Sequence, residues 1–381
     1  MNLPVTKIQY IHVTPGRRIL AVSDIHGHRA YLQKVLEMAN FSKEDLLFVV
    51  GDLLEKGPDS LGTLRYVMEL YKAGNVVPLI GNVDAYRMYF IQKMDADTAE
   101  ELWQYIKSCR TWYGSSFYEE LAKECGYELC CGKDVLAARE PIAEHFREEL
   151  DFLAGLPTVV ETERFVFVHG GLKEKAVEEN AKHDVFALTK YDGFADRTPH
   201  VFEKCVVTGH WPVALYNGSI QQYNPLYCKE KNILSMDGGC GIKSEGQLNL
   251  VVIPHMDCGM EEISHISYDE LPMLLAKETQ EAGEDSLFIR WTDREIQILE
   301  KGKEFSYVHH VRSGRDLYVP TSLLYTDTEC LDYSDYVLPV EIGDRLSLVL
   351  KTSRGCIVKK NGVVGWYTGR YEEKEPSETT P

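Results

Sequence analysis

Short apolar segments that end in acidic, histidine or asparagine side chains recur five times in the first 210 residues of the chain. The first segment, Ile-Leu-Ala-Val at residues 19–22, is followed by Ser-Asp-Ile-His-Gly-His. Such side chains do little to end a strand, but they are the ligands that hard and borderline cations prefer. Open α/β sheets bind ligands at the carboxyl ends of their strands, so we expect these residues to share one site. The six candidates are Asp24, His26, Asp52, Asn82, His169 and His210.

The same part of the chain alternates between strand and helix patterns. Two segments carry apolar side chains at helical spacing, at residues 30–39 and 61–71. The segments between them predict strands, and Pro78 in the last one favours an edge position. The resulting β-α-β-α-β order predicts a parallel, doubly wound sheet. The predicted strands are residues 19–24, 46–50 and 76–80.

The later part of this region contains a helical insertion and more strands. Residues 85–155 are mostly helical in pattern, and we expect them to form an inserted lid or wall. Apolar strands are predicted at residues 165–168 and 205–208, each ending at one of the histidine motifs. Residues 233–236 and 248–253 are predicted to be strands of a second sheet.

A chain of 381 residues is too long for a single small core, so more than one domain is expected. From about residue 285 the pattern changes to short alternating strands, and Asn361-Gly362 predicts a tight hairpin. The last residues are acidic and rich in serine, threonine and proline, which is typical of disorder. The predicted divisions are an α/β domain at 1–255, a linker at 256–284, a β-rich region at 285–372 and a disordered tail at 373–381.

The six candidate ligands suit a pair of divalent cations. Two cations a few ångströms apart need a bridging carboxylate, with imidazole and oxygen ligands on each side. Asp52 is predicted to bridge, and Asp24 and His26 are predicted to hold one metal. Asn82, His169 and His210 would complete the second. Nitrogen and oxygen ligands of this kind suit manganese, iron or zinc, so the metal identity stays open.

Five ordered motifs, DIHG, GDLLEKGPDS, GNVD, HGG and GHWP, resemble those of the calcineurin-like metallophosphoesterases. The resemblance covers residues 18–253 and is greatest to the serine/threonine-phosphatase branch and the symmetrical bis-nucleoside tetraphosphatases. It implies a four-layer αββα sandwich, two divalent metal ions, and hydrolysis of phosphate esters by attack of a metal-bound hydroxide. Asp237 in the MDGG segment matches a family strand end and is expected to line the site and contact substrate.

The chain departs from the family motifs at two positions. Lys56 stands where the family has the arginine that holds substrate phosphate, so the charge is kept but the bidentate fork is lost. Val83 replaces the histidine that acts as general acid with help from the next carboxylate, here Asp84. Lys190 is either a second phosphate-binding group or a solvated surface lysine. Arg87, Arg139 and Arg197 are weaker candidates for substrate binding.

Two functions follow from these residues. The first is a metal-dependent phosphoesterase that lacks the usual general acid and acts on phosphoproteins, dinucleoside polyphosphates or small phosphodiesters. The alternative is a weak or inactive phosphate-binding scaffold. Residues 317–371 resemble a bacterial SH3-like barrel, which implies a possible peptide partner. Its aromatic residues, either exposed for that partner or packed in the core, are Tyr318, Tyr325, Trp366 and Tyr367.

Composition narrows the classes of partner. The formal net charge of −18 argues against binding nucleic acid through an overall positive field. No apolar run approaches the ~20 residues of a membrane helix, and the first residues do not resemble a signal peptide. Ten cysteines without a repeated spacing favour reduced thiols. We therefore expect a cytoplasmic protein.

Overall fold

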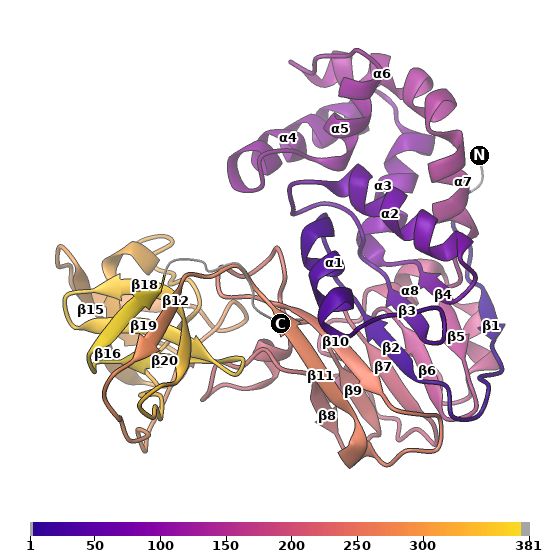
Figure 1. The fold of residues 1–381 in the computed structure, drawn as a ribbon. Coiled ribbons are helices and arrows are strands. Elements are labelled where there is room, and N and C mark those ends of the chain that lie inside the picture. Colours follow the sequence, from indigo (N-terminus) through magenta and orange to yellow (C-terminus); the bar gives the residue numbers. More distant parts are fainter. Residues whose placement is uncertain (1–2, 375–381) are drawn as a thin grey trace. The chain divides into compact units, whose positions relative to one another are not determined.

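The computed structural model describes residues 3–374, which form two units (Figure 1). The larger unit runs through Pro212 and resumes at Pro225–Tyr268. The smaller unit consists of Val213–Asn224 and the residues from Asp269 onward. The chain therefore divides at positions other than those expected. The predicted linker at 256–284 contains strands of both units, and a segment directly after the GHWP motif belongs to the smaller one.

The first sheet of the larger unit has the strand order β11-β10-β2-β3-β4. Its central strands β2, β3 and β4 are parallel, as the alternating pattern predicts. Pro78 lies in the edge strand β4, where the missing N–H breaks no ladder between two neighbours. The strands are β2 (Ile19–Val22), β3 (Leu46–Val50), β4 (Val76–Leu79), β10 (Leu248–Ile253) and β11 (Ser264–Tyr268).

The second sheet has the order β1-β5-β6-β7-β9-β8. The prediction that residues 233–236 and 248–253 share a second sheet is wrong. β9 pairs with β7 in this sheet, whereas β10 pairs antiparallel with β2 in the other. Both segments are apolar and largely buried, and that pattern does not encode the pairing partner. The strands are β1 (Ile8–Tyr10), β5 (Val159–Glu161), β6 (Phe165–Val168), β7 (Cys205–Thr208), β8 (Leu226–Cys228) and β9 (Ile233–Ser235).

The two sheets pack against each other through one side of their alternating strands. Phe48 of β3 and Phe167 of β6 stack with ring centroids 3.8 Å apart at an interplanar angle of 9°. The neighbours of Phe48 in β3, Leu47 and Val49, belong to the other apolar core, with the helices. Burial on both faces explains why these strands are continuously apolar rather than alternating.

Helices cover the first sheet and build the insertion. Asp59 accepts a hydrogen bond from the Gly62 N–H and so caps α2. The predicted insertion is helical, and α4, α5 and α6 lie farther from the sheets than α2 and α3 (Figure 1). No helix within residues 3–374 is long and apolar enough to span a bilayer. The helices are α1 (Arg29–Met38), α2 (Ser60–Lys72), α3 (Asn82–Lys93), α4 (Ala96–Trp112), α5 (Phe117–Glu124), α6 (Gly132–His145), α7 (Arg147–Gly155), α8 (Val185–Thr189) and α9 (Phe194–Arg197), with 3-10 turns η1 (Glu178–Lys182), η2 (Val213–Tyr216), η3 (Met260–Glu262) and η4 (Thr321–Leu323).

The smaller unit is built almost entirely of strands, as expected. Asn361 and Gly362 form a two-residue hairpin loop between β19 and β20, with φ of 48° and 75°. Such positive values define the predicted tight turn. The strands are β12 (Met273–Ala276), β13 (Phe288–Ile289), β14 (Ile296–Glu300), β15 (Phe305–His310), β16 (Arg315–Pro320), β17 (Tyr333–Ser334), β18 (Arg345–Thr352), β19 (Gly355–Lys360), β20 (Val363–Tyr367) and β21 (Tyr371–Lys374).

The aromatic residues of this unit divide between core and surface. Tyr367 is fully buried, and its hydroxyl donates to backbone carbonyls of the same unit. Trp366 is partly buried, and its Nε1–H donates to the Tyr333 hydroxyl. Tyr318 and Tyr325 are exposed. Residues 373 and 374 belong to β21 rather than to the predicted tail, of which residues 375–381 lie outside the described part of the chain.

Candidate metal centre

The strand ends deliver the predicted ligands to one place. Asp24 and His26 follow β2, and Asp52 follows β3. Asn82 is the first residue of α3, directly after β4. His169 follows β6, and His210 follows β7, so both sheets contribute. The structure brings all six side chains together.

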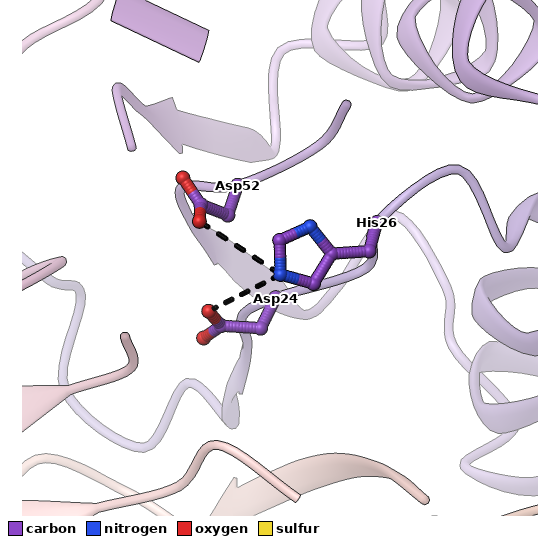
Figure 2. Close-up of side chains that lie close together, drawn as sticks. All are labelled: Asp24, His26 and Asp52. Carbon is purple, nitrogen blue, oxygen red and sulfur yellow. Dashed lines mark ion pairs between the residues drawn. The ribbon is translucent and has the colours of Figure 1, made fainter. Parts of the chain in front are cut away.

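Asp24, His26 and Asp52 form the most compact group (Figure 2). The Nε2 atom of His26 lies 3.9 Å from Oδ1 of Asp24 and 3.8 Å from Oδ2 of Asp52. Each residue offers one ligand atom, and these atoms all lie within 4.8 Å of one another. All three side chains are buried. Two buried carboxylates this close to an imidazole nitrogen form a donor set that suits a divalent cation.

The second group surrounds Asp52 from the other side. Nε2 of His169 lies 3.4 Å from Oδ1 of Asp52 and 4.0 Å from Oδ1 of Asp24. One terminal amide atom of Asn82 lies 3.1 Å from Nε2 of His169 and 2.8 Å from Nδ1 of His210. The backbone N–H of His210 donates to Oδ2 of Asp24 over 3.0 Å. Asp52 thus lies between the two groups, where a bridging carboxylate belongs.

Backbone carbonyls fix which imidazole nitrogen faces the cluster. Nδ1 of His26 lies 3.1 Å from the Leu54 carbonyl oxygen, and Nδ1 of His169 lies 2.8 Å from that of Val50. A carbonyl oxygen only accepts, so Nδ1 carries the proton in both rings. The Nε2 atoms therefore face the carboxylates, as they would in residues that bind a metal. The donor set fits two cations on this criterion.

Most of the cluster residues have strained backbones. Asp24, His26, Asp52 and His210 have φ of 53°, 48°, 53° and 66°. Positive φ is uncommon in residues other than glycine, and it clusters at functional sites. Glycine is also required nearby, because a Cβ on Gly81 would lie 2.1 Å from the backbone nitrogen of Asp52. The loops are therefore shaped to aim side chains inward.

Charge and burial shift the pKa values of the cluster strongly. Burial opposes protonation of His169, yet the Asp52 and Asp24 carboxylates raise its pKa to about 10. Burial and the Lys56 ammonium lower the pKa of His26 to about 3. Burial raises the pKa of Asp52, but the charge and hydrogen bond of His169, together with the Lys56 ammonium, outweigh burial and hold that pKa well below its usual range. The buried carboxylates thus stay ionised only with positive charge beside them. That charge comes either from a proton on His169 or from a bound cation.

The remaining predicted site residues lie in different settings. Nζ of Lys56 is 3.4 Å from Nε2 of His26, so Lys56 reaches the cluster. Nζ of Lys190 is exposed and pairs with Asp192 over 3.2 Å. Asp237 is buried, and its Oδ1 accepts from the Gly239 N–H. Burial and the Asp24 charge raise the pKa of Asp237 well above its usual value.

Asp84 braces the loop that carries Asp52. Its Oδ1 accepts from the N–H groups of Leu53 and Leu54, and its Oδ2 accepts from that of Gly81. Burial and the Asp52 charge raise the pKa of Asp84 to about 7. Because its carboxylate accepts three backbone hydrogen bonds, Asp84 is placed to hold the Asp52 loop in position.

Two supporting contacts are not predictable from the sequence. Oδ1 of Asp192 lies 2.8 Å from Nε2 of His210. Arg87, a weak candidate for substrate binding, is instead buried in an ion pair with Glu55 at 2.6 Å. Aspartate and glutamate at these positions look like ordinary polar residues in the sequence. The only available signal is their closeness along the chain to Lys190 and Lys56.

Comparison with known proteins agrees with this geometry. Residues 17–235, more than half of the 381-residue chain, match the family described as Calcineurin-like phosphoesterase. The chain belongs to the calcineurin-like phosphoesterase family. This result bears out the family resemblance that the five motifs predict.

Individual relatives are similar over short segments. A symmetrical bis(5'-nucleosyl)-tetraphosphatase of Psychromonas ingrahamii is 40% identical over 77 residues, which cover 20% of this chain and 27% of that protein. The same enzyme of Photorhabdus laumondii is 45% identical over 64 residues, or 16% of this chain and 22% of that protein. The match thus spans about a quarter of each relative. A solved serine/threonine phosphatase of Saccharomyces cerevisiae is 13% identical, covers 71% of this chain and 85% of its own, and has a TM-score of 0.41.

Proposed function

We propose that the chain is a dinuclear metal-dependent phosphoesterase. The observation that carries this proposal is the convergence of six ligating side chains around the Asp52 carboxylate. Asp24, His26 and Asp52 would hold one cation, and Asp52, Asn82, His169 and His210 would hold the other. Bound cations of this kind supply a water of lowered pKa and positive charge beside the phosphoryl oxygens.

The chain's own residues then bind and orient the phosphoryl group. Lys56 places an ammonium beside His26, where it would hold a phosphate oxygen as a point charge. Asp84 acts as a positioning residue, because its carboxylate fixes the Asp52 loop. Lys190 would reach substrate only by leaving its pair with Asp192. Asp237 is fully buried beside the Asp24 charge, so we expect it to support the cluster rather than to contact substrate.

Val83 limits the choice of substrate. Its buried side chain stands where the family places a proton donor, and it has no proton to give. General acid catalysis typically contributes roughly 10² to 10⁴ in rate. Substrates whose leaving group needs no protonation, such as aryl esters and phosphoanhydrides, are therefore favoured. The dinucleoside polyphosphates in the names of the relatives belong to this class.

The direct test replaces the central carboxylate. In Asp52→Asn, we expect loss of bound Mn²⁺, measured by elemental analysis of the purified protein, and loss of p-nitrophenyl phosphate hydrolysis. Asp151→Asn, an exposed aspartate on α7, is the matched control and should keep both. Wild-type protein that binds no divalent metal and shows no turnover would end this proposal.

The missing proton donor also supports the alternative of a phosphate-binding scaffold. If the protein is a scaffold, its Mn²⁺-loaded form would bind inorganic phosphate, as measured by calorimetry. It would nevertheless hydrolyse neither aryl phosphates nor phosphoanhydrides. Turnover of either substrate that disappears in Asp52→Asn excludes the scaffold as the sole function.

A further inference from the structure

Two exposed aromatic rings lie on the helices that contact the candidate metal cluster. Tyr86 is four residues after Asn82 in α3, and its side chain is 46% exposed. Phe186 is three residues before Thr189 in α8, and its side chain is 37% exposed. The two ring centroids are 6.3 Å apart with an interplanar angle of 83°. The rings therefore contact each other although they come from different helices.

The cluster and the ring pair are joined by short contacts. One terminal amide atom of Asn82 lies 3.3 Å from the Thr189 carbonyl oxygen. The loop after His169 is tied to the same helix, since the N–H groups of Gly170 and Gly171 both donate to the Leu188 carbonyl over 3.0 Å. Residues four apart on a helix share a face, about 6 Å apart along its axis. Tyr86 thus lies about one turn along α3 from Asn82, and Phe186 lies on the helix whose last residue contacts Asn82.

The ring of Tyr86 is held in place from within. Phe90, which is buried, contacts it edge-on with centroids 4.7 Å apart at 88°. A ring that is packed on one edge and half exposed loses little conformational freedom when it binds a ligand. Exposed aromatic side chains of this kind are the usual platforms on which nucleobases stack.

Under the proposed function, the chemistry at Val83 favours the same class of ligand. Without a proton donor, the site favours leaving groups that depart as stable anions, and a phosphoanhydride provides one. A phosphoanhydride that also carries an aromatic group is a nucleoside polyphosphate. We propose that Tyr86 and Phe186 form a subsite for the nucleobase of such a ligand, with its phosphate at the cluster. This inference rests on the proposed function for the position of the phosphate.

The test compares two ligands that differ only in the nucleoside. Calorimetry on the Mn²⁺-loaded full chain would measure the Kd of AMP and of inorganic phosphate. In Tyr86→Ala we expect the Kd of AMP to rise about tenfold, from the loss of one stacking contact, while that of phosphate is unchanged. Phe186→Ala should also raise the Kd of AMP. Tyr86→Phe, which keeps the ring, should bind AMP as tightly as the wild type does. Tyr71→Ala removes a ring of 51% exposure at the far end of α2 and is the matched control.

The outcomes separate this subsite from the proposed catalysis. If AMP binds no more tightly than phosphate in the wild type, or if Tyr86→Ala weakens both alike, the subsite is wrong even where the enzyme turns over. If the protein hydrolyses nothing yet Tyr86→Ala selectively weakens AMP, the subsite stands and the catalytic proposal fails. With active enzyme, Tyr86→Ala should also lower kcat/KM about tenfold for adenosine 5'-tetraphosphate but not for inorganic tripolyphosphate.

Discussion

The carboxylate of Asp192 lies 2.8 Å from Nε2 of His210, the ring nitrogen that faces away from Asn82. Burial lowers the pKa of His210, and the hydrogen bond to Asp192 opposes that effect. The same carboxylate pairs with Lys190. Asp192 therefore keeps the proton of His210 on Nε2 and leaves Nδ1 as the nitrogen that faces the cluster.

Removing this contact should weaken metal binding without removing a ligand. Supporting carboxylates of metal-binding histidines typically contribute 10- to 100-fold in affinity. In Asp192→Asn we expect the affinity of one of two Mn²⁺ ions to fall by about tenfold, measured by calorimetry on the metal-free protein. Asp196→Asn, an exposed aspartate on α9, should change neither ion. Two unchanged affinities in Asp192→Asn would contradict the positioning role.

On the proposal that Val83 replaces a general acid, a histidine at this position should help poor leaving groups most. Val83 lies next to Asn82, and its N–H donates to Oδ1 of Asp52 over 2.9 Å. Val83→His keeps that backbone contact and supplies a side chain that can protonate the departing oxygen. We expect hydrolysis of alkyl phosphates to rise by up to roughly 10². The gain with p-nitrophenyl phosphate should be smaller, because its leaving group needs little protonation.

Steady-state kinetics on both substrates with Mn²⁺ would decide this point. Val83→Ala is the control for the change in packing and should favour neither substrate. Equal gains on alkyl and aryl phosphates in Val83→His would mean that general acid catalysis is not what the site lacks.

The sequence predicts the elements that carry the site better than the way they assemble. Leu46–Val50 and Phe165–Val168 were predicted at their observed bounds, because short buried strands between turn signals have a clear pattern. The pairing of Ile233–Ser235 with β7 was not predictable, since hydrophobicity does not distinguish one sheet from the other. Long-range pairing depends on the whole fold.

The same limit applies to the candidate site. Asp24 and His26 were identified because they directly follow an apolar strand. Their positive φ angles were not predictable, because such angles are typical of glycine and these positions are occupied by aspartate and histidine. Asp192 and Arg87 act through contacts with residues 18 and 32 positions away, and no local pattern reports such a partner.

The buried pair of Glu55 and Arg87 links the Asp52 loop to α3. Their side chains are 0% and 6% exposed, and the guanidinium lies 4.0 Å from the centroid of the Tyr105 ring. Removing one partner of a buried pair leaves an uncompensated charge, which typically costs about 3–5 kcal/mol. We therefore expect Arg87→Met to lower the free energy of unfolding by that amount, measured by urea denaturation.

A double variant distinguishes the cost of the unpaired Glu55 charge from the cost of lost packing against Tyr105. Glu55→Gln combined with Arg87→Met removes both charges, and most of the lost stability should return. A double variant as unstable as Arg87→Met alone would show that the cost arises from lost contacts with Tyr105 rather than from the unpaired carboxylate.

Glu120 should make the stability of the larger unit depend on pH. Its carboxylate accepts from the N–H groups of Ser60 and Leu61 at the start of α2, yet burial outweighs these bonds and raises its pKa from 4.5 to about 7. The folded state then binds more protons than the unfolded state between these two values. The free energy of unfolding therefore falls as the pH rises through that window.

The Glu120→Gln variant has no titrating group at this position. Its free energy of unfolding, compared with that of the wild type, should therefore improve by roughly 1–2 kcal/mol between pH 4.5 and pH 8. This value is reduced because the side chain is partly exposed. Urea denaturation followed by circular dichroism would measure the difference, with the exposed Glu128→Gln as the control, and a gap between the Glu120→Gln variant and wild type that stays constant with pH would refute the assignment.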